Sequence, residues 1–234
     1  MSSSANSAMS FRPRQLALGL AHAESFARED FLSGACNEAA LQLIDCWPDW
    51  PANAVALVGP EGSGKTHLAM IWAAAAGARV IAARALEKAE LPSALATGAL
   101  IVEDAAAADD RVLFHLLNLA REDNASLLFT ARAAPATWPA AIPDLVSRLR
   151  ALPVATLQAP DDAMLRAVIV KLAADRQLAL DESVVRYLST HIERSFAAAR
   201  AAVIALDNEA LRQRRPATRA LAAELFGGES RAGG

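Results

Sequence analysis

The chain of 234 residues is poor in aromatic residues, in cysteine and in long apolar runs, and each shortage excludes a class of protein. Its two cysteines, Cys36 and Cys46, have a spacing that fits no metal or redox motif, so we expect structural thiols. No run of about 18 or more uncharged apolar residues is present, which excludes an ordinary transmembrane helix. The N-terminal stretch MSSSANSAMSFRPR lacks the apolar region of a secretory signal, so we expect a cytoplasmic protein.

A basic excess is also missing, since the formal net charge is -3. A protein that binds nucleic acid broadly carries a basic footprint, so we expect no direct sequence-specific DNA binding and no membrane contact. Hydrophobic types make up 54% of the residues, which excludes a disordered chain. The length corresponds to one large domain or two small ones, with enough residues to bury a sizeable core.

Hydrophobic patterning divides the chain into two parts. Short apolar runs alternate with helical patterns at 54–58, 79–82, 99–102, 127–130 and 153–157, with helices expected after residue 65 and near 110–122. This alternation predicts an α/β fold with a parallel five-stranded sheet covered on both faces. Beyond residue 160 only helical spacing remains, at 161–176, 181–190, 194–213 and 217–226. We therefore expect a disordered tail at 1–14, a separate apolar peptide at 15–20, an α/β domain at 21–158, a helical domain at 159–226 and a second tail at 227–234.

A glycine-rich loop follows the first apolar run. It fits the pattern G-x-x-x-x-G-K-[ST] with Gly59, Pro60, Glu61, Gly62, Ser63, Gly64, Lys65 and Thr66. Backbone N–H groups close around phosphate oxygens in such a loop, and the start of the following helix adds positive potential. Lys65 is expected to reach the phosphates and Thr66 to bind Mg²⁺, so the loop predicts ADP or ATP as cofactor. A glycine-rich turn without a ligand is the alternative.

A pair of acids, Glu103 and Asp104, ends the third apolar run about 35 residues downstream of the loop. Parallel strands bring their carboxyl ends to one edge of a sheet, where ligands of α/β proteins bind. Glu103 is expected to hold the metal, and Asp104 to orient an attacking water as a catalytic residue. The alternative is that both acids only open the next loop.

Together these motifs, with the strand order and the appended helices, resemble the AAA+ ATPases and more closely the DnaA branch, over about residues 15–213. The resemblance implies that Phe31 and Leu32 contact the adenine base; the alternative is that both are ordinary core residues. It implies that Arg148, in the segment DLVSRL, is an arginine finger that touches a nucleotide on a neighbouring subunit; a local salt bridge is the alternative. It also makes Arg194 the residue of the helical domain that reaches back to the phosphates.

Two positions depart from the DnaA branch. Glu103 stands where the first acid of the branch is aspartate, and the residues after the fourth strand include no acid. Thr130 is the only polar candidate there, and Ala131 and Arg132 follow it. Both departures predict nucleotide binding with weak or absent intrinsic hydrolysis.

The N-terminal peptide narrows the resemblance. Gln15, Leu16, Leu18 and Leu20 fit the clamp-binding pattern Q-L-x-L-x-L, in which an extended segment presents alternate leucines to an apolar groove. The sequence ends after the helical domain, where DnaA continues into a helix-turn-helix domain. On these features the chain is identified as a member of the Hda or HdaA family, the regulatory inactivators of DnaA. A local strand or linker is the alternative explanation of the peptide.

The family resemblance implies a nucleotide-bound regulator of replication initiation. Its implied partners are DnaA and the DNA polymerase III sliding clamp (beta subunit), and a homodimer is left open. Arg148 would act in trans on ATP held by DnaA, while the chain's own nucleotide, expected to be ADP, would be structural. Two alternatives stand beside this hypothesis: a DnaA-like helicase-loader ATPase, and a non-catalytic AAA+ scaffold of the replication machinery.

Overall fold

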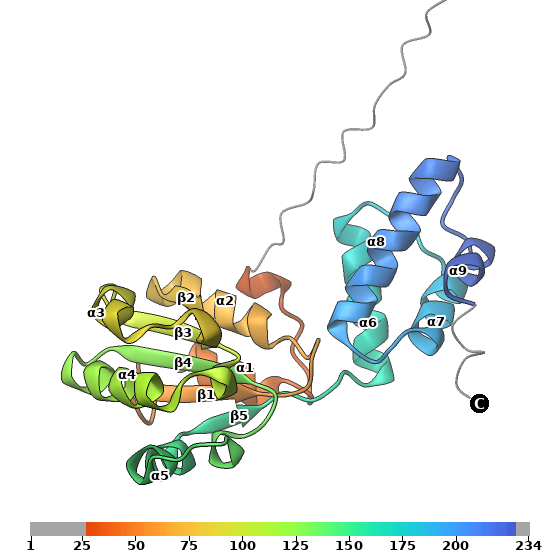
Figure 1. The fold of residues 1–234 in the computed structure, drawn as a ribbon. Coiled ribbons are helices and arrows are strands. Elements are labelled where there is room, and N and C mark those ends of the chain that lie inside the picture. The colour runs from red at the N-terminus through yellow and green to blue at the C-terminus, as the bar shows by residue number, and fades with distance from the viewer. Residues whose placement is uncertain (1–26, 228–234) are drawn as a thin grey trace, which may run out of the picture.

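A computed structural model describes residues 27–227 of the chain (Figure 1). The apolar peptide with Gln15, Leu16, Leu18 and Leu20 lies outside the described residues, so the clamp hypothesis rests on the sequence. The described part has a sheet with flanking helices, which we call the base, and a group of helices after residue 160, which we call the lid.

The base is built on a five-stranded sheet with the order β2-β3-β4-β1-β5. Its strands are β1 (Ala54–Val58), β2 (Arg79–Ala82), β3 (Ala99–Glu103), β4 (Ser126–Ala131) and β5 (Val154–Thr156). Every pair of neighbouring strands is parallel. All the carboxyl ends therefore lie at one edge of the sheet, which places the glycine-rich loop after β1 near the acids that end β3.

Helices cover both faces of the sheet, because strand residues alternate between two cores. Alternate residues of β1 pack in separate clusters, one with Ala54, Ala56 and Val58 and the other with Val55 and Leu57. The first cluster is closed by α3 (Leu91–Ala94), α4 (Asp110–Glu122) and α5 (Pro143–Ala151), and the second by α1 (Glu38–Asp45) and α2 (Lys65–Ala76). The sheet is thus the middle layer of three.

A group of tryptophans stabilises the face that α1 and α2 cover. Trp72 of α2 is fully buried, and the ring of Trp50 stacks on it with 4.8 Å between centroids. Trp47 meets Trp72 edge to face at 6.3 Å, and the Trp47 indole N–H donates to Ser126 Oγ at the start of β4. On the opposite face Trp138 meets Phe129 edge to face. Such aromatic pairs add to the area that the rings bury.

The lid has a core of its own. It comprises α6 (Asp162–Asp175), α7 (Glu182–His191), α8 (Phe196–Gln213) and α9 (Arg219–Phe226). Each helix begins at a side chain that accepts a hydrogen bond from the first turn, and these N-caps are Asp161, Asp181, Ser195 and Thr218. The core cluster of the lid contains residues of 165–222 only, so the lid packs as a separate unit on the right of Figure 1.

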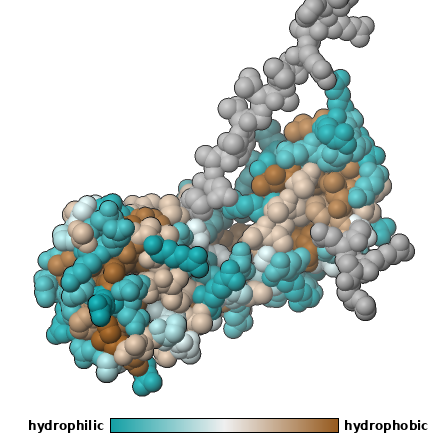
Figure 2. Space-filling view, in the orientation of Figure 1, coloured by the Kyte–Doolittle hydropathy of each residue, from teal (hydrophilic) through white to brown (hydrophobic). Residues whose placement is uncertain are grey.

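The predicted α/β fold with five parallel strands and a helical lid is confirmed. Three helices of the base were not predicted: α1, α3 and α5. Within the described range, no helix combines the length and the apolar character needed to cross a bilayer. Figure 2 shows hydrophilic residues mixed with apolar ones over the surface of both the base and the lid. Val170 of α6 and Leu211 of α8 are among the exposed apolar side chains.

Candidate nucleotide-binding site

The loop between β1 and α2 has a shape that requires glycine. Gly62 and Gly64 have φ of 70° and 95°, a left-handed conformation that other residues rarely adopt. A Cβ atom on Gly59 would lie 2.5 Å from the carbonyl oxygen of Leu157. The three glycines of the motif are therefore all needed for the backbone path, and this path turns the loop into the N-terminus of α2.

Lys65 and Ser63 point to a ligand in this loop. The Lys65 ammonium donates to the carbonyl oxygens of Gly59 and Pro60, at 2.8 and 2.7 Å, so it is held against the loop. Burial lowers the pKa of Lys65, while the nearby negative charge of Asp104 opposes that change. The Ser63 hydroxyl is buried and has no hydrogen-bond partner among the described residues. A buried hydroxyl without a partner is costly, and a phosphate oxygen would satisfy it.

Across from the loop, the acids that end β3 meet Thr66. The Thr66 hydroxyl donates to Glu103 Oε1 at 3.3 Å, which brings the two predicted metal ligands together. Asp104 has φ of 52°, and its N–H donates to the Thr130 hydroxyl at 3.3 Å. The described residues contain no cluster of three His, Cys, Asp or Glu side chains suited to a metal. A hydroxyl and a carboxylate nevertheless supply oxygen ligands of the kind that Mg²⁺ binds, and nucleotide phosphates would supply further oxygens.

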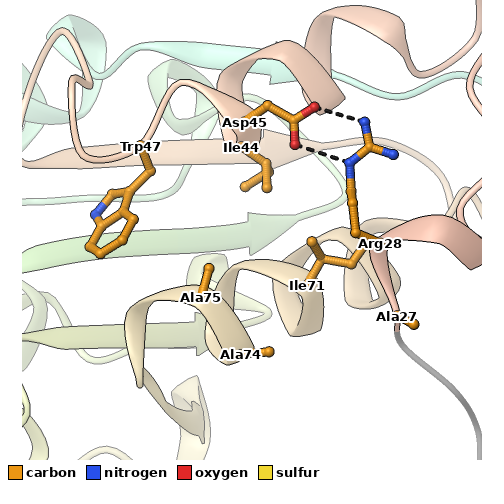
Figure 3. Close-up of a pocket in the computed structure, with 8 residues that line it drawn as sticks. All are labelled: Ala27, Arg28, Ile44, Asp45, Trp47, Ile71, Ala74 and Ala75. Carbon is orange, nitrogen blue, oxygen red and sulfur yellow. Dashed lines mark hydrogen bonds and ion pairs between the residues drawn. The ribbon is translucent and has the colours of Figure 1, made fainter.

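A cavity of about 300 Å³ opens beside these acids. Its lining comprises Ala82, Ala83, Arg84, Glu103, Asp104, Ala107 and Arg132. A larger pocket of about 380 Å³ lies elsewhere, between α1, α2 and the first described residues (Figure 3). That pocket is mainly apolar, and its one cation, Arg28, is engaged by Asp45. The smaller cavity carries the charged groups that suit phosphate chemistry, so we take it as part of the candidate site.

Arg132 and Glu61 form an ion pair that sequence reasoning did not anticipate. Arg132 Nη2 lies 2.6 Å from Glu61 Oε2, so the residue after β4 is connected to the phosphate loop. Both side chains are mostly exposed, at 70% and 78%, and such pairs add little to stability. The sequence gives no sign that these two charges pair, because 71 positions separate the two residues.

The lid touches the phosphate loop directly. The N–H of Phe196, the first residue of α8, donates to the Gly62 carbonyl at 2.9 Å. A Cβ on Gly62 would lie 2.8 Å from Ser195 Cβ, and one on Gly64 would contact the ring of Phe196. The sequence motif gives no sign of this contact, although Ser195 before an apolar stretch marks the start of the helix that makes it.

Arg194 lies next to this contact, and its ion-pair partner is in the lid. Its guanidinium is 2.7 Å from Asp162 at the start of α6, and both side chains are more than half exposed. Arg194 directly precedes Ser195 and Phe196, the two residues that contact the loop, and its charge is directed to Asp162. A contact of Arg194 with phosphate stays a prediction.

Phe31 and Leu32 lie on the segment that leads into α1. Phe31 is only 9% exposed and meets the ring of His67 edge to face, at 5.3 Å between centroids. A Cβ on Gly64 would lie 3.7 Å from the Phe31 ring, so Phe31 packs against the loop. Leu32 is partly buried, and its carbonyl accepts from Asn37 Nδ2 at 3.0 Å. The segment is thus next to the phosphate loop, and the base contact stays a prediction.

Arg148 lies on α5, which Figure 1 shows on the base and away from the lid. It donates to Asn118 Oδ1 at 2.7 Å, and its guanidinium lies 5.1 Å from the centroid of the Phe114 ring. Asp144 on the same helix is 3.7 Å away. The side chain is 32% exposed, so local contacts orient it while part of it reaches the surface.

Comparisons with solved structures identify the fold. No protein-family model matches the chain, and no curated protein matches it. Domain III of the replication initiation protein DnaA from Thermotoga maritima matches with a TM-score of 0.72 and 19% identity, over 86% of this chain and 95% of that one. AMPPCP-bound DnaA from Aquifex aeolicus matches with a TM-score of 0.62 and 17% identity, over 81% and 69%.

A second kind of motor domain has the same architecture. The RuvB Holliday junction branch migration motor of Thermotoga maritima matches with a TM-score of 0.69 and 16% identity, over 87% of this chain and 72% of that one. The chain therefore has the AAA+ fold, in which a phosphate-loop base carries a helical lid. Within that class the similarity to DnaA domain III makes the fold DnaA-like.

Proposed function

We propose that the chain binds an adenine nucleotide, ADP or ATP, with Mg²⁺ at the loop of residues 59–66. The three glycines, the held Lys65 ammonium and the buried Ser63 hydroxyl support this proposal. The solved DnaA from Aquifex aeolicus is bound to AMPPCP, which is an ATP analogue. Thr66 and Glu103 would hold the metal, and Phe31 and Leu32 would contact the base.

Replacing Lys65 by alanine is expected to remove nucleotide binding. The change deletes the ammonium that balances the phosphate charge, while the fold remains. In a thermal melt, ADP at about 100 times its Kd should stabilise the parent by about 2.7 kcal/mol and Lys65→Ala much less. Lys88→Ala, which removes an exposed lysine, is the control and should respond like the parent. Equal stabilisation of Lys65→Ala and the parent would refute the nucleotide proposal.

We further propose that the protein regulates replication initiation: it is recruited by the DNA-loaded sliding clamp and stimulates ATP hydrolysis by DnaA. The DnaA-like fold supports this proposal, together with the resemblance of the Arg148 segment to the arginine-finger segment of the DnaA branch. The peptide with Gln15, Leu16, Leu18 and Leu20 supplies the clamp contact, and Arg148 supplies the finger. A division into an α/β domain at 21–158 and a lid at 159–226 belongs to the same proposal, supported by the separate lid core.

The isolated protein is expected to hydrolyse ATP slowly or not at all. Glu103 stands where the DnaA branch has aspartate, and the Thr130 hydroxyl is engaged by the Asp104 N–H. Steady-state release of phosphate from ATP, in the presence of Mg²⁺ and without partners, measures this directly. Sustained turnover at a rate typical of enzymes, about 1 s⁻¹ or more, would instead favour the helicase-loader alternative, in which the protein's own hydrolysis is the timer.

A further inference from the structure

Residues 27–37, which we call the strap, lie between the base and the lid. The strap begins with the short turn Arg28–Asp30, continues through Phe31 and Leu32, and ends at Asn37, just before α1. Figure 1 shows it at the side of the base that faces the lid. It is the first described segment of the chain, and it carries the two residues expected to contact the base of the nucleotide.

The base holds the strap through several contacts. Arg28 donates to both carboxylate oxygens of Asp45 in α1, at 3.0 and 2.8 Å (Figure 3). Asn37 is only 1% exposed, and its side chain accepts from the Gly34 N–H and donates to the Leu32 carbonyl. Phe31 packs on α2, as described above. These bonds fix the shape of the strap and attach it to the base.

The lid holds the same segment from the other side. Asp30, two residues from Arg28, accepts from the Lys171 ammonium of α6 at 2.7 Å, across 141 positions of sequence. The two side chains are only 31% and 24% exposed, so water screens this pair less than the surface pairs. The hydrogen bond to Asp30 raises the pKa of Lys171. At Gly34 the strap comes so close to α6 that an added Cβ would lie 2.3 Å from Met164 Cε.

We propose that Asp30 and Lys171 are positioning residues that close the strap over the bound nucleotide and couple its retention to the position of the lid. This inference rests on the nucleotide site proposed above. The strap and the lid both reach the phosphate loop, since the rings of Phe31 and Phe196 lie next to Gly64, and the ion pair joins the two. The contact of Phe196 with Gly62 attaches the lid to the loop at a second point. Breaking the pair therefore loosens the strap side of the lid, where the packing of Met164 near Gly34 remains, while the loop side stays attached.

Lys171 has a second partner, which provides a matched control. Its ammonium also lies 3.0 Å from Asp175, one turn further along α6. That pair is internal to the lid and joins no other element. Asp175→Asn therefore removes a carboxylate from the same ammonium without breaking the connection between lid and strap. Asp30→Asn removes the carboxylate on the strap side, and Lys171→Met removes the ammonium while it keeps the alkyl stem.

The first test measures the release of a fluorescent ADP analogue by stopped flow in the full chain. Asp30→Asn and Lys171→Met are each expected to release it roughly fivefold faster, the effect of losing one ion pair. The double variant is expected to release it no faster than either single one, because both changes remove the same contact. Asp175→Asn is expected to behave like the parent. Release from Asp30→Asn at the rate of the parent would refute the inference.

The second test follows the lid in the absence of nucleotide, so it does not depend on the proposed function. Cys46 on the base is exposed, and Ala201→Cys adds an exposed thiol on α8, so a donor and an acceptor dye can be attached to the two parts. The dye-to-dye distance distribution is expected to broaden in Asp30→Asn and to stay unchanged in Asp175→Asn. An unchanged distribution in both would refute the coupling. A parent that binds no ADP, with a broadened distribution in Asp30→Asn, would count against the nucleotide site alone.

Discussion

Replacing Arg148 by alanine is expected to abolish the stimulation of DnaA's ATP hydrolysis while leaving nucleotide binding intact. An arginine finger supplied in trans stabilises the charge of the phosphoryl-transfer transition state and accelerates hydrolysis by about 10³–10⁵-fold. The measurement is phosphate release from ATP-loaded DnaA with the DNA-loaded clamp and the parent or variant protein. The stimulated rate should fall to the level of DnaA alone.

The local contacts of Arg148 determine which control variants the stimulation assay needs. Because Arg148 packs on Phe114 and binds Asn118, its removal also loses local contacts, worth about 0.5–1 kcal/mol for an exposed cation and a ring. Arg150→Ala removes an exposed charge from the same helix and should stimulate like the parent. Arg148→Lys keeps the charge but not the planar fork, so it should rescue little activity. Full stimulation by a folded Arg148→Ala protein would show that the finger assignment is wrong and would favour the scaffold alternative.

Replacing Gln15, Leu16 and Leu18 together by alanine is expected to abolish binding to the sliding clamp without affecting the fold. Burying each leucine in an apolar groove contributes roughly 1.5–3 kcal/mol, and a short peptide has no other anchor. If the segment adds nothing to the folded core, the free energy of unfolding should change by less than about ±0.5 kcal/mol. Binding to immobilised clamp and a thermal melt together measure both effects.

A structural role for the same segment leads to the opposite result. Were these residues a strand or a packed linker, the triple variant would melt at a much lower temperature, and its folded fraction would still bind the clamp. Ser2, Ser3 and Ser4 replaced by alanine form a control in the same N-terminal region and should change neither measurement. Clamp binding that survives in a fully stable triple variant would contradict the assignment of the clamp contact to this peptide, and also its structural role.

Local patterns were sufficient to predict most of the fold. The helix expected near 110–122 is α4 (Asp110–Glu122), because Asp109 caps it and apolar residues recur at helical spacing. The loop of residues 59–66 could be placed for a similar reason, since its glycines and its flanking strand and helix are adjacent in sequence. Strands β1, β3 and β4 were found because buried parallel strands are short, continuous apolar runs. The edge strands β2 and β5 are mostly exposed, and they were found as short apolar runs between helical patterns.

The missed helices have weaker local signals. Helix α5 buries only Leu145 and Leu149, and α3 is a single turn that contains a proline, so neither shows a sustained apolar periodicity. Helix α1 has a clear apolar face, but the side chain of Asn37 does not cap it. That side chain forms hydrogen bonds with the backbone of Gly34 and Leu32 instead. Tertiary contacts stabilise these helices more than propensity does.

In the candidate site, the contacts that sequence reasoning missed are long-range. Phe196 with Gly62, Arg132 with Glu61 and Lys171 with Asp30 each join segments far apart in the chain, and each appears only once the lid and the strands are placed. A motif identifies the residues that line a loop. It does not show which other segment packs on that loop, since this depends on the packing of whole elements.

The tryptophans lie in only one of the two parts of the molecule, so their fluorescence reports on that part alone. All four, Trp47, Trp50, Trp72 and Trp138, belong to the base, and the lid has the single tyrosine of the chain, Tyr187. Intrinsic tryptophan emission therefore reports the base, whereas far-ultraviolet circular dichroism also registers the helices of the lid. If the two parts unfold separately, the two signals give different melting curves, and any ligand that joins the parts brings the curves together. The wild-type chain thus contains its own internal probe of whether lid and base act as one cooperative unit.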